Sequence, residues 1–176
     1  MGLLTSTSSL ALWQQVVKTA EEQCAISLKQ ELESYLVTLL IRYSNKPEVA
    51  QRILATAYLE AMQLKHHARD VSLQYVADEC LLYAGLFPRL AEKRQVTPTY
   101  FIDLGRSAYA AISHHTNDLF AHLANQFILL MDILRSIRSP IDLHPWETYM
   151  QWSELGSPHA ANTLEKYTNI LPFKPR

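Results

Sequence analysis

Apolar residues recur at spacings of three and four along most of this chain of 176 residues, and this period constrains its fold more than any other feature. Such spacing places side chains on one face of an α-helix. No segment of useful length alternates apolar and polar residues as a strand does, and only 4 glycines are available for tight turns. The longest apolar series comprises Phe120, Leu123, Phe127, Leu130, Leu134 and Ile137. The pattern predicts an all-α fold.

A chain of this length can bury one core, and we expect a single-domain bundle of six to eight helices over residues 1–176, with residues 1–8 and 171–176 flexible. The expected helix starts are marked by capping residues: Ser8 or Ser9, Ser27 with Gln30, Pro47, Asp70, Thr97 with Pro98, and Asn117. These signals predict helices over about 8–24, 27–43, 47–65, 70–84, 97–113 and 118–138, with two short helices near 146–154 and 158–167.

Two glycines lie within or beside these helices, and the sequence suggests a different role for each. Gly85 is followed by Leu86 and Pro88, which is typical of a helix that ends at a glycine in the left-handed conformation. Gly105 lies in the middle of an expected helix, where it costs about 1 kcal/mol relative to alanine. We therefore expect Gly85 to end a helix and another helix to approach closely at Gly105.

Composition excludes several classes of partner. The formal net charge is −1 and no basic face is evident, so we expect no nucleic-acid binding. No apolar run approaches the roughly 20 residues that span a bilayer, and the N-terminus lacks the features of a signal peptide. Gly2 and Ser6 fit the N-myristoylation pattern, but no basic patch follows to complete a membrane anchor. Cys24 and Cys80 lie in apolar helical patterns and are expected to be buried free thiols, which favours a cytoplasmic protein.

A pattern of aromatic and small residues lies between Asp78 and Ser113. A Gly-x-Phe turn is followed by a valine, a Tyr-Phe pair and Gly-x-x-Ala-Tyr, in which the matching residues are Gly85, Phe87, Val96, Tyr100, Phe101, Gly105, Ala108 and Tyr109. In this pattern the chain resembles a family of small uncharacterised helical proteins of bacteria, of the proteobacterial type. The resemblance covers about a fifth of the chain and implies a cytosolic helical protein of bacterial origin. It carries no established reaction, so it transfers no catalytic residue.

Histidine and aspartate side chains near the start of the sixth expected helix could hold a metal ion. The candidate ligands are His115, Asp118 and His122, or His114 in place of His115, with His66 and His67 as additions from another helix. Each set lies on one helical face, and imidazole and carboxylate groups suit Zn or Fe. The alternative is that these residues are solvated at helix ends and that no cofactor is bound.

A second candidate site is a polar network between the fourth and fifth expected helices. If these helices pack through their glycines, five residues could meet: Asp78, Tyr100, Asp103, Arg106 and Tyr109. The favoured interpretation is a hydrogen-bond network that fixes helix packing, and the alternative is a ligand pocket.

The sixth expected helix also bears on the oligomeric state. Its apolar series is either the core of the monomer or a surface that forms a two-fold dimer, with Trp146, Tyr149 and Trp152 at the rim.

The di-iron, zinc-protease, P-loop, dinucleotide-binding and Gly-x-Ser-x-Gly motifs are absent. We therefore expect a non-enzymatic interaction or regulatory protein that binds a second copy or another protein. The alternative is a small-molecule or metal-binding helical enzyme that uses the His/Asp cluster.

Overall fold

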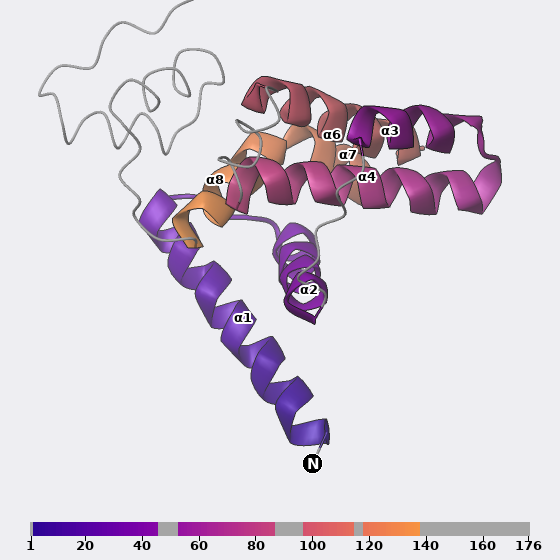
Figure 1. Cartoon of the computed structure of the whole chain (residues 1–176). Helices are drawn as coiled ribbons and strands as arrows, with labels where there is room; N and C mark the ends of the chain where they lie inside the picture. Colours follow the sequence, from indigo (N-terminus) through magenta and orange to yellow (C-terminus); the bar gives the residue numbers. More distant parts are fainter. Residues whose placement is uncertain (1, 46–52, 87–96, 115–117, 138–176) are drawn as a thin grey trace, which may run out of the picture.

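A computed structural model of the protein describes residues 2–45, 53–86, 97–114 and 118–137. Within these ranges the chain forms seven α-helices and no strand, which confirms the predicted all-α bundle. The helices, labelled as in Figure 1, are α1 (Gly2–Cys24), α2 (Gln30–Asn45), α3 (Leu54–Gln63), α4 (His66–Leu86), α6 (Pro98–Ile112), α7 (Leu119–Asn125) and α8 (Phe127–Ile137). None of these helices is both long and apolar enough to cross a membrane.

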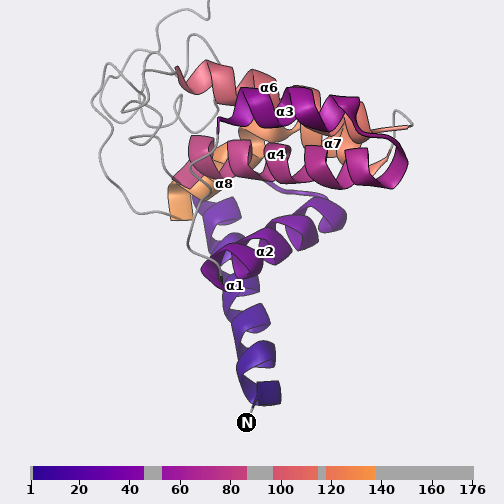
Figure 2. The same ribbon diagram turned by 45° about the vertical axis from the view of Figure 1, so that its right-hand side comes forward.

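Helix α4 lies at the centre of the arrangement and packs against α3, α6 and α8. Helix α6 also contacts α7, and α2 packs against α1 and α7. Helix α1 packs against α2 and α8 through its C-terminal half, while its N-terminal half extends away from the other helices (Figures 1 and 2). The described helices thus form a bundle from which the N-terminal half of α1 projects.

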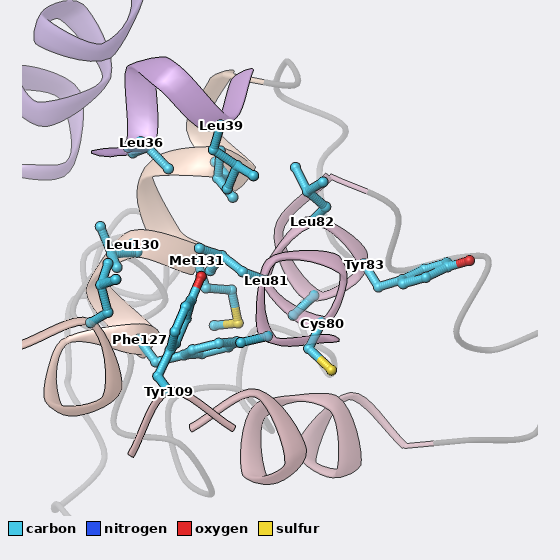
Figure 3. Packing of buried hydrophobic residues seen from close by; sticks show 14 of the residues in the cluster. Leu36, Leu39, Cys80, Leu81, Leu82, Tyr83, Tyr109, Phe127, Leu130 and Met131 are labelled. Atoms are coloured by element: carbon cyan, nitrogen blue, oxygen red, sulfur yellow. The ribbon is translucent and has the colours of Figure 1, made fainter. Parts of the chain in front are cut away.

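Helix α8 contributes a fully buried apolar face to the core of the bundle. Its apolar side chains Phe127, Leu130, Met131, Ile133 and Leu134 are fully buried. The ring of Phe127 packs against Tyr109 at a centroid distance of 6.2 Å, near Cys80 and Met131 (Figure 3). The apolar series that the sequence left open between core and pairing surface is therefore core. Trp146, Tyr149 and Trp152 lie outside the described residues.

The two cysteines, Cys24 and Cys80, are buried and are not joined in a disulfide, as predicted. Cys24 lies at the C-terminal end of α1, and Cys80 is completely buried on α4.

Several helix ends differ from the sequence predictions. The predicted sixth helix is two helices, because the backbone departs from helical geometry at Gln126 (φ −105°, ψ 18°). Helix α4 begins at His66, where the sequence predicted a break up to Asp70, and the chain turns one or two residues earlier. Helix α2 begins at Gln30, and the backbone carbonyl of Lys29 accepts from its first N–H groups. The predicted capping box at Ser27 is therefore wrong. The start of α6 after Thr97, with Pro98 in its first turn, is as predicted.

Gly85 does not end its helix by adopting a left-handed conformation, so that prediction is wrong. Helix α4 continues through Gly85 to Leu86, and Gly85 is buried against α8. A Cβ atom at position 85 would lie 2.5 Å from the Cβ atom of Leu134. In sequence, a glycine near a proline is compatible both with the end of a helix and with a close contact between helices. In the structure, Gly85 has the second role. Pro88 lies outside the described residues.

Gly105 has the role that the sequence predicted. A Cβ atom there would lie 2.6 Å from the ring of Phe127 and 2.9 Å from the Cβ atom of Cys80. The glycine therefore lets α6 approach α4 and α8 together. The two glycines fix the spacing of the three central helices.

Replacing Gly85 or Gly105 with alanine is expected to lower the free energy of unfolding by about 1–3 kcal/mol. The added methyl group overlaps atoms that cannot move without moving a helix, which outweighs the gain of about 1 kcal/mol in helix propensity. Urea denaturation followed by circular dichroism measures the change. Ser107→Ala, at an exposed position of α6, is the matched control and should leave stability unchanged or slightly higher. A Gly85→Ala variant as stable as wild type would contradict the close approach.

Candidate functional site

The carboxyl group of Asp78 is a buried ionisable group that links several helices. It lies on α4 and is only 3% exposed. A carboxylate removed from water is destabilising unless hydrogen bonds and opposite charge compensate it. Its surroundings therefore determine what this position can do.

Four side chains from three helices surround this carboxyl group. Its Oδ1 atom accepts hydrogen bonds from the hydroxyl groups of Tyr35 (2.5 Å) and Tyr109 (2.6 Å). Its Oδ2 atom pairs with Nη1 of Arg42 at 3.2 Å. The amide of Gln74 donates to the hydroxyl of Tyr35 at 3.1 Å. We call these five residues, Asp78, Tyr35, Tyr109, Arg42 and Gln74, the Asp78 centre.

Helical spacing explains how the centre is assembled. Tyr35 and Arg42 are two turns apart on one face of α2, and Gln74 and Asp78 are one turn apart on α4. Tyr109 comes from the buried face of α6. The ring of Tyr35 meets Tyr109 (6.2 Å) and Phe120 (6.5 Å) edge to face. The aromatic rings thus close the centre on one side, and Arg42, whose side chain is 41% exposed, lies on the solvent side.

Burial and hydrogen bonding act in opposite directions on the charge of Asp78. Burial raises its pKa to about 6, against the pull of the two tyrosine hydroxyls and of Arg42, which lower it. The pKa values of Tyr35 and Tyr109 are raised, first by burial and then by the negative charge of Asp78. Near neutral pH the centre therefore contains an ionised carboxylate held by two protonated phenols and a guanidinium. It can take up one proton at mildly acidic pH.

The structure brings together Asp78 and Tyr109 of the five residues in the predicted polar network. Asp103 and Arg106 lie on the exposed side of α6. Tyr100 is exposed at the edge of the bundle, where its ring packs against Phe101 at a centroid distance of 5.5 Å.

Sequence reasoning missed Tyr35, Arg42 and Gln74. The seven-residue spacing of Tyr35 and Arg42 was visible, but the sequence does not show that α2 packs against α4 at this point. Whether the network serves packing or lines a ligand pocket stays a prediction.

The candidate metal ligands make other contacts in the described residues. Asp118 caps α7: its Oδ1 atom accepts from the N–H of Ala121 and its Oδ2 atom accepts from the N–H of His114, both at 2.8 Å. Nδ1 of His122 lies 2.5 Å from Oε1 of Glu31 on α2. Nε2 of His114 lies 3.7 Å from Oδ2 of Asp70.

His66 and His67 are exposed at the start of α4. No three histidine, cysteine, aspartate or glutamate side chains are grouped as metal ligands within the described ranges, and His115 lies outside them. The Zn or Fe site stays a prediction.

An apolar face of α1 is a further candidate functional site. Leu10, Trp13, Val17, Ala20 and Cys24 lie on one face, and we call them the α1 stripe. Its C-terminal members are buried: Val17 is 0%, Ala20 2% and Cys24 1% exposed. Trp13 is partly buried against the core, and Leu10 is 43% exposed. The same stripe therefore runs from the core out onto the surface.

Comparison with protein-family models, curated proteins and solved structures finds no match for this chain. The resemblance to a bacterial family stays a prediction, but its residues have clear physical roles. Gly85 and Gly105 are close helix contacts, Phe101 and Ala108 are buried, and Tyr109 donates to Asp78. Phe87 and Val96 lie outside the described residues. Apart from the exposed Tyr100, the described residues of the pattern are thus packing determinants.

The buried carboxyl group predicts a specific pH dependence of stability. The pKa of Asp78 is about 6 in the folded protein and near its ordinary value of 3.8 in the unfolded chain. The folded state binds this proton more tightly, so the contribution of Asp78 is largest below pH 3.8 and falls as the pH rises to about 6, by about 3 kcal/mol. Urea denaturation across this range should show the stability of wild type falling relative to Asp78→Asn. A difference independent of pH would contradict the raised pKa.

The hydroxyl of Tyr109 should contribute most when Asp78 is ionised. Tyr109→Phe removes one donor to the buried carboxylate and is expected to lower the free energy of unfolding by about 1.5–3 kcal/mol at neutral pH. The loss should be smaller at acidic pH, where the carboxyl group is protonated. Tyr75→Phe, on the exposed side of α4, is the matched control and should have little effect at either pH. Equal losses for both variants would argue against the hydrogen bond.

Proposed function

We propose that this protein is a non-enzymatic interaction protein that binds a second copy of itself through the N-terminal half of α1. The observation that carries the proposal is the decline in burial along the α1 stripe, from Val17, which is 0% exposed, to Leu10, which is 43% exposed. One apolar face continues beyond the point where other described helices cover it. A face of this kind is completed when another apolar surface packs against it.

The projecting half of α1 has a charge distribution that suits a second copy. Between Gly2 and Val17 the sequence has no charged residue, and the first charge along α1 is Lys18. In a two-fold interface the same surface meets itself, so like charges oppose each other wherever the surface is charged. A neutral stripe avoids this repulsion. The lack of lysine and arginine also disfavours nucleic acid and anionic lipid as partners, since both are bound chiefly by basic side chains.

The Asp78 centre supports a structural role within such a protein. Its carboxylate, phenols and amide satisfy one another across α2, α4 and α6. A network of this kind holds helices at a fixed spacing. It provides a rigid support for a docking helix.

A bacterial, cytoplasmic location is part of the proposal. The buried thiols of Cys24 and Cys80 are consistent with a reducing compartment. The family resemblance in the α4 and α6 region supports a bacterial origin.

Sedimentation analysis of the full chain tests the interaction. Wild type is expected to sediment as a dimer at micromolar concentration, and Leu10→Asp is expected to shift it to monomer, because each charge would be buried against an apolar partner. Ala11→Asp introduces the same charge at the neighbouring exposed position, off the stripe, and should remain dimeric. Circular dichroism of each variant checks that the helical fold is kept.

Two outcomes would contradict the proposal. A wild-type protein that is monomeric at tens of micromolar concentration would exclude a stable second copy. A dimer unaffected by Leu10→Asp would place the interface elsewhere, and the exposed side chains of Leu59 and Met62 on α3 would be the next surface to test.

A further inference from the structure

The guanidinium group of Arg135 is held near the C-terminal end of α8 by one hydrogen bond. Its Nε atom donates to the backbone carbonyl of Ala84, in the last turn of α4, at 3.1 Å. Its Nη1 and Nη2 atoms are buried, and the structure gives neither of them a hydrogen-bond partner among the described residues. Two charged donor groups are therefore withdrawn from water at a defined place in the fold.

This place is a joint where the ends of three helices meet. The C-terminal ends of α1, α4 and α8 lie together in both views (Figures 1 and 2). The hydroxyl of Ser136 donates to Gln23 at 2.8 Å, and the thiol of Cys24 donates to the carbonyl of Asp132 at 3.7 Å. The contact of Gly85 with Leu134 brings α4 against α8 one residue before Arg135. The backbone around the guanidinium is therefore fixed on three sides.

The charges near Arg135 leave its terminal nitrogens unsatisfied. Burial lowers the pKa of Arg135, and the charge of Asp132, which is completely buried one turn earlier on α8, opposes this shift only in part. The carbonyl of Ala84 occupies only Nε. An arginine side chain remains charged even when buried, and a charged donor without a partner is strongly destabilising.

We propose that the guanidinium group of Arg135 binds an oxyanion, a carboxylate or a phosphate group, at the joint of α1, α4 and α8. The two Nη atoms form a planar fork, whose spacing matches two oxygen atoms of one carboxylate or phosphate. A water molecule or a single carbonyl group would accept from one Nη group and leave the other without a hydrogen-bond acceptor. The site is thus specific for a group that offers two oxygens in one plane.

Thermal unfolding of the full chain tests this site with simple probes. The probes are inorganic phosphate and acetate, each titrated against chloride at constant ionic strength. One of them is expected to raise the melting temperature of wild type by several degrees at saturating concentration, because a ligand that binds only the folded state stabilises it. A response to phosphate alone identifies a phosphate group, and a response to acetate identifies a carboxylate.

Variants of Arg135 distinguish hydrogen bonding by both Nη atoms from attraction by positive charge alone. Arg135→Met should abolish the response, and Arg135→Lys, which keeps the charge without the fork, should reduce it at least tenfold in apparent affinity. Arg106→Met, on the exposed side of α6, is the matched control and should respond like wild type. If Arg135→Met does not fold, the lysine variant decides the question.

Three results would overturn the proposal: no shift of wild type with either probe, an unchanged response in the Arg135→Met variant, or equal responses of wild type and Arg135→Lys. None of them depends on whether the protein dimerises through the α1 stripe.

Discussion

The close approach of α4 to α6 and α8 is the constraint on which the rest of the structure depends. Gly85 and Gly105 permit it, since a Cβ atom at either position would lie within 3 Å of atoms on a neighbouring helix. Helix axes that come this close place Phe127 against Tyr109 and leave the apolar face of α8 fully buried. They also bring the hydroxyl of Tyr109 within reach of Asp78 on α4. The buried polar contacts are therefore a consequence of how two glycines set the packing distance.

Asp78, Arg135 and Glu21 each join segments that are distant or differently oriented. Asp78 connects α2, α4 and α6, and Arg135 connects α8 to the last turn of α4. Glu21 accepts a hydrogen bond from the N–H of Leu28 at 2.7 Å, and so fixes the turn between α1 and α2, where Ala25 has a φ of 53°. Apolar contacts tolerate a range of helix positions, whereas these hydrogen bonds require one. The polar groups select a single packing among the many that a set of amphipathic helices allows.

The sequence predicted those features that depend on local periodicity. The predictions failed where the role of a residue depends on its contacts with another helix. The helices themselves, the start of α6 at Pro98 and the close approach at Gly105 follow from spacing and propensity. The role of Gly85 was wrong because Leu134, which determines it, is far away in sequence. The break at Gln126 was missed because the apolar period continues through it, from Leu123 to Phe127. Of the Asp78 centre, the sequence suggested Asp78 and Tyr109. It missed Gln74 and the two residues contributed by α2, since no local signal shows which helices pack together.

Helix α1 takes part in both proposed sites, the α1 stripe and the joint of α1, α4 and α8. Its C-terminal end is tied to α8 through Gln23 and Cys24 and to the α2 side through Glu21. Its N-terminal half projects from the other described helices (Figures 1 and 2), and the ties at the other end help to set the direction of this projection. Arg135 lies beside those ties, one residue before Ser136 on α8. An anion that orders this joint would therefore also fix the direction of the α1 stripe, which is a requirement for any two-fold contact between copies that relies on a projecting helix.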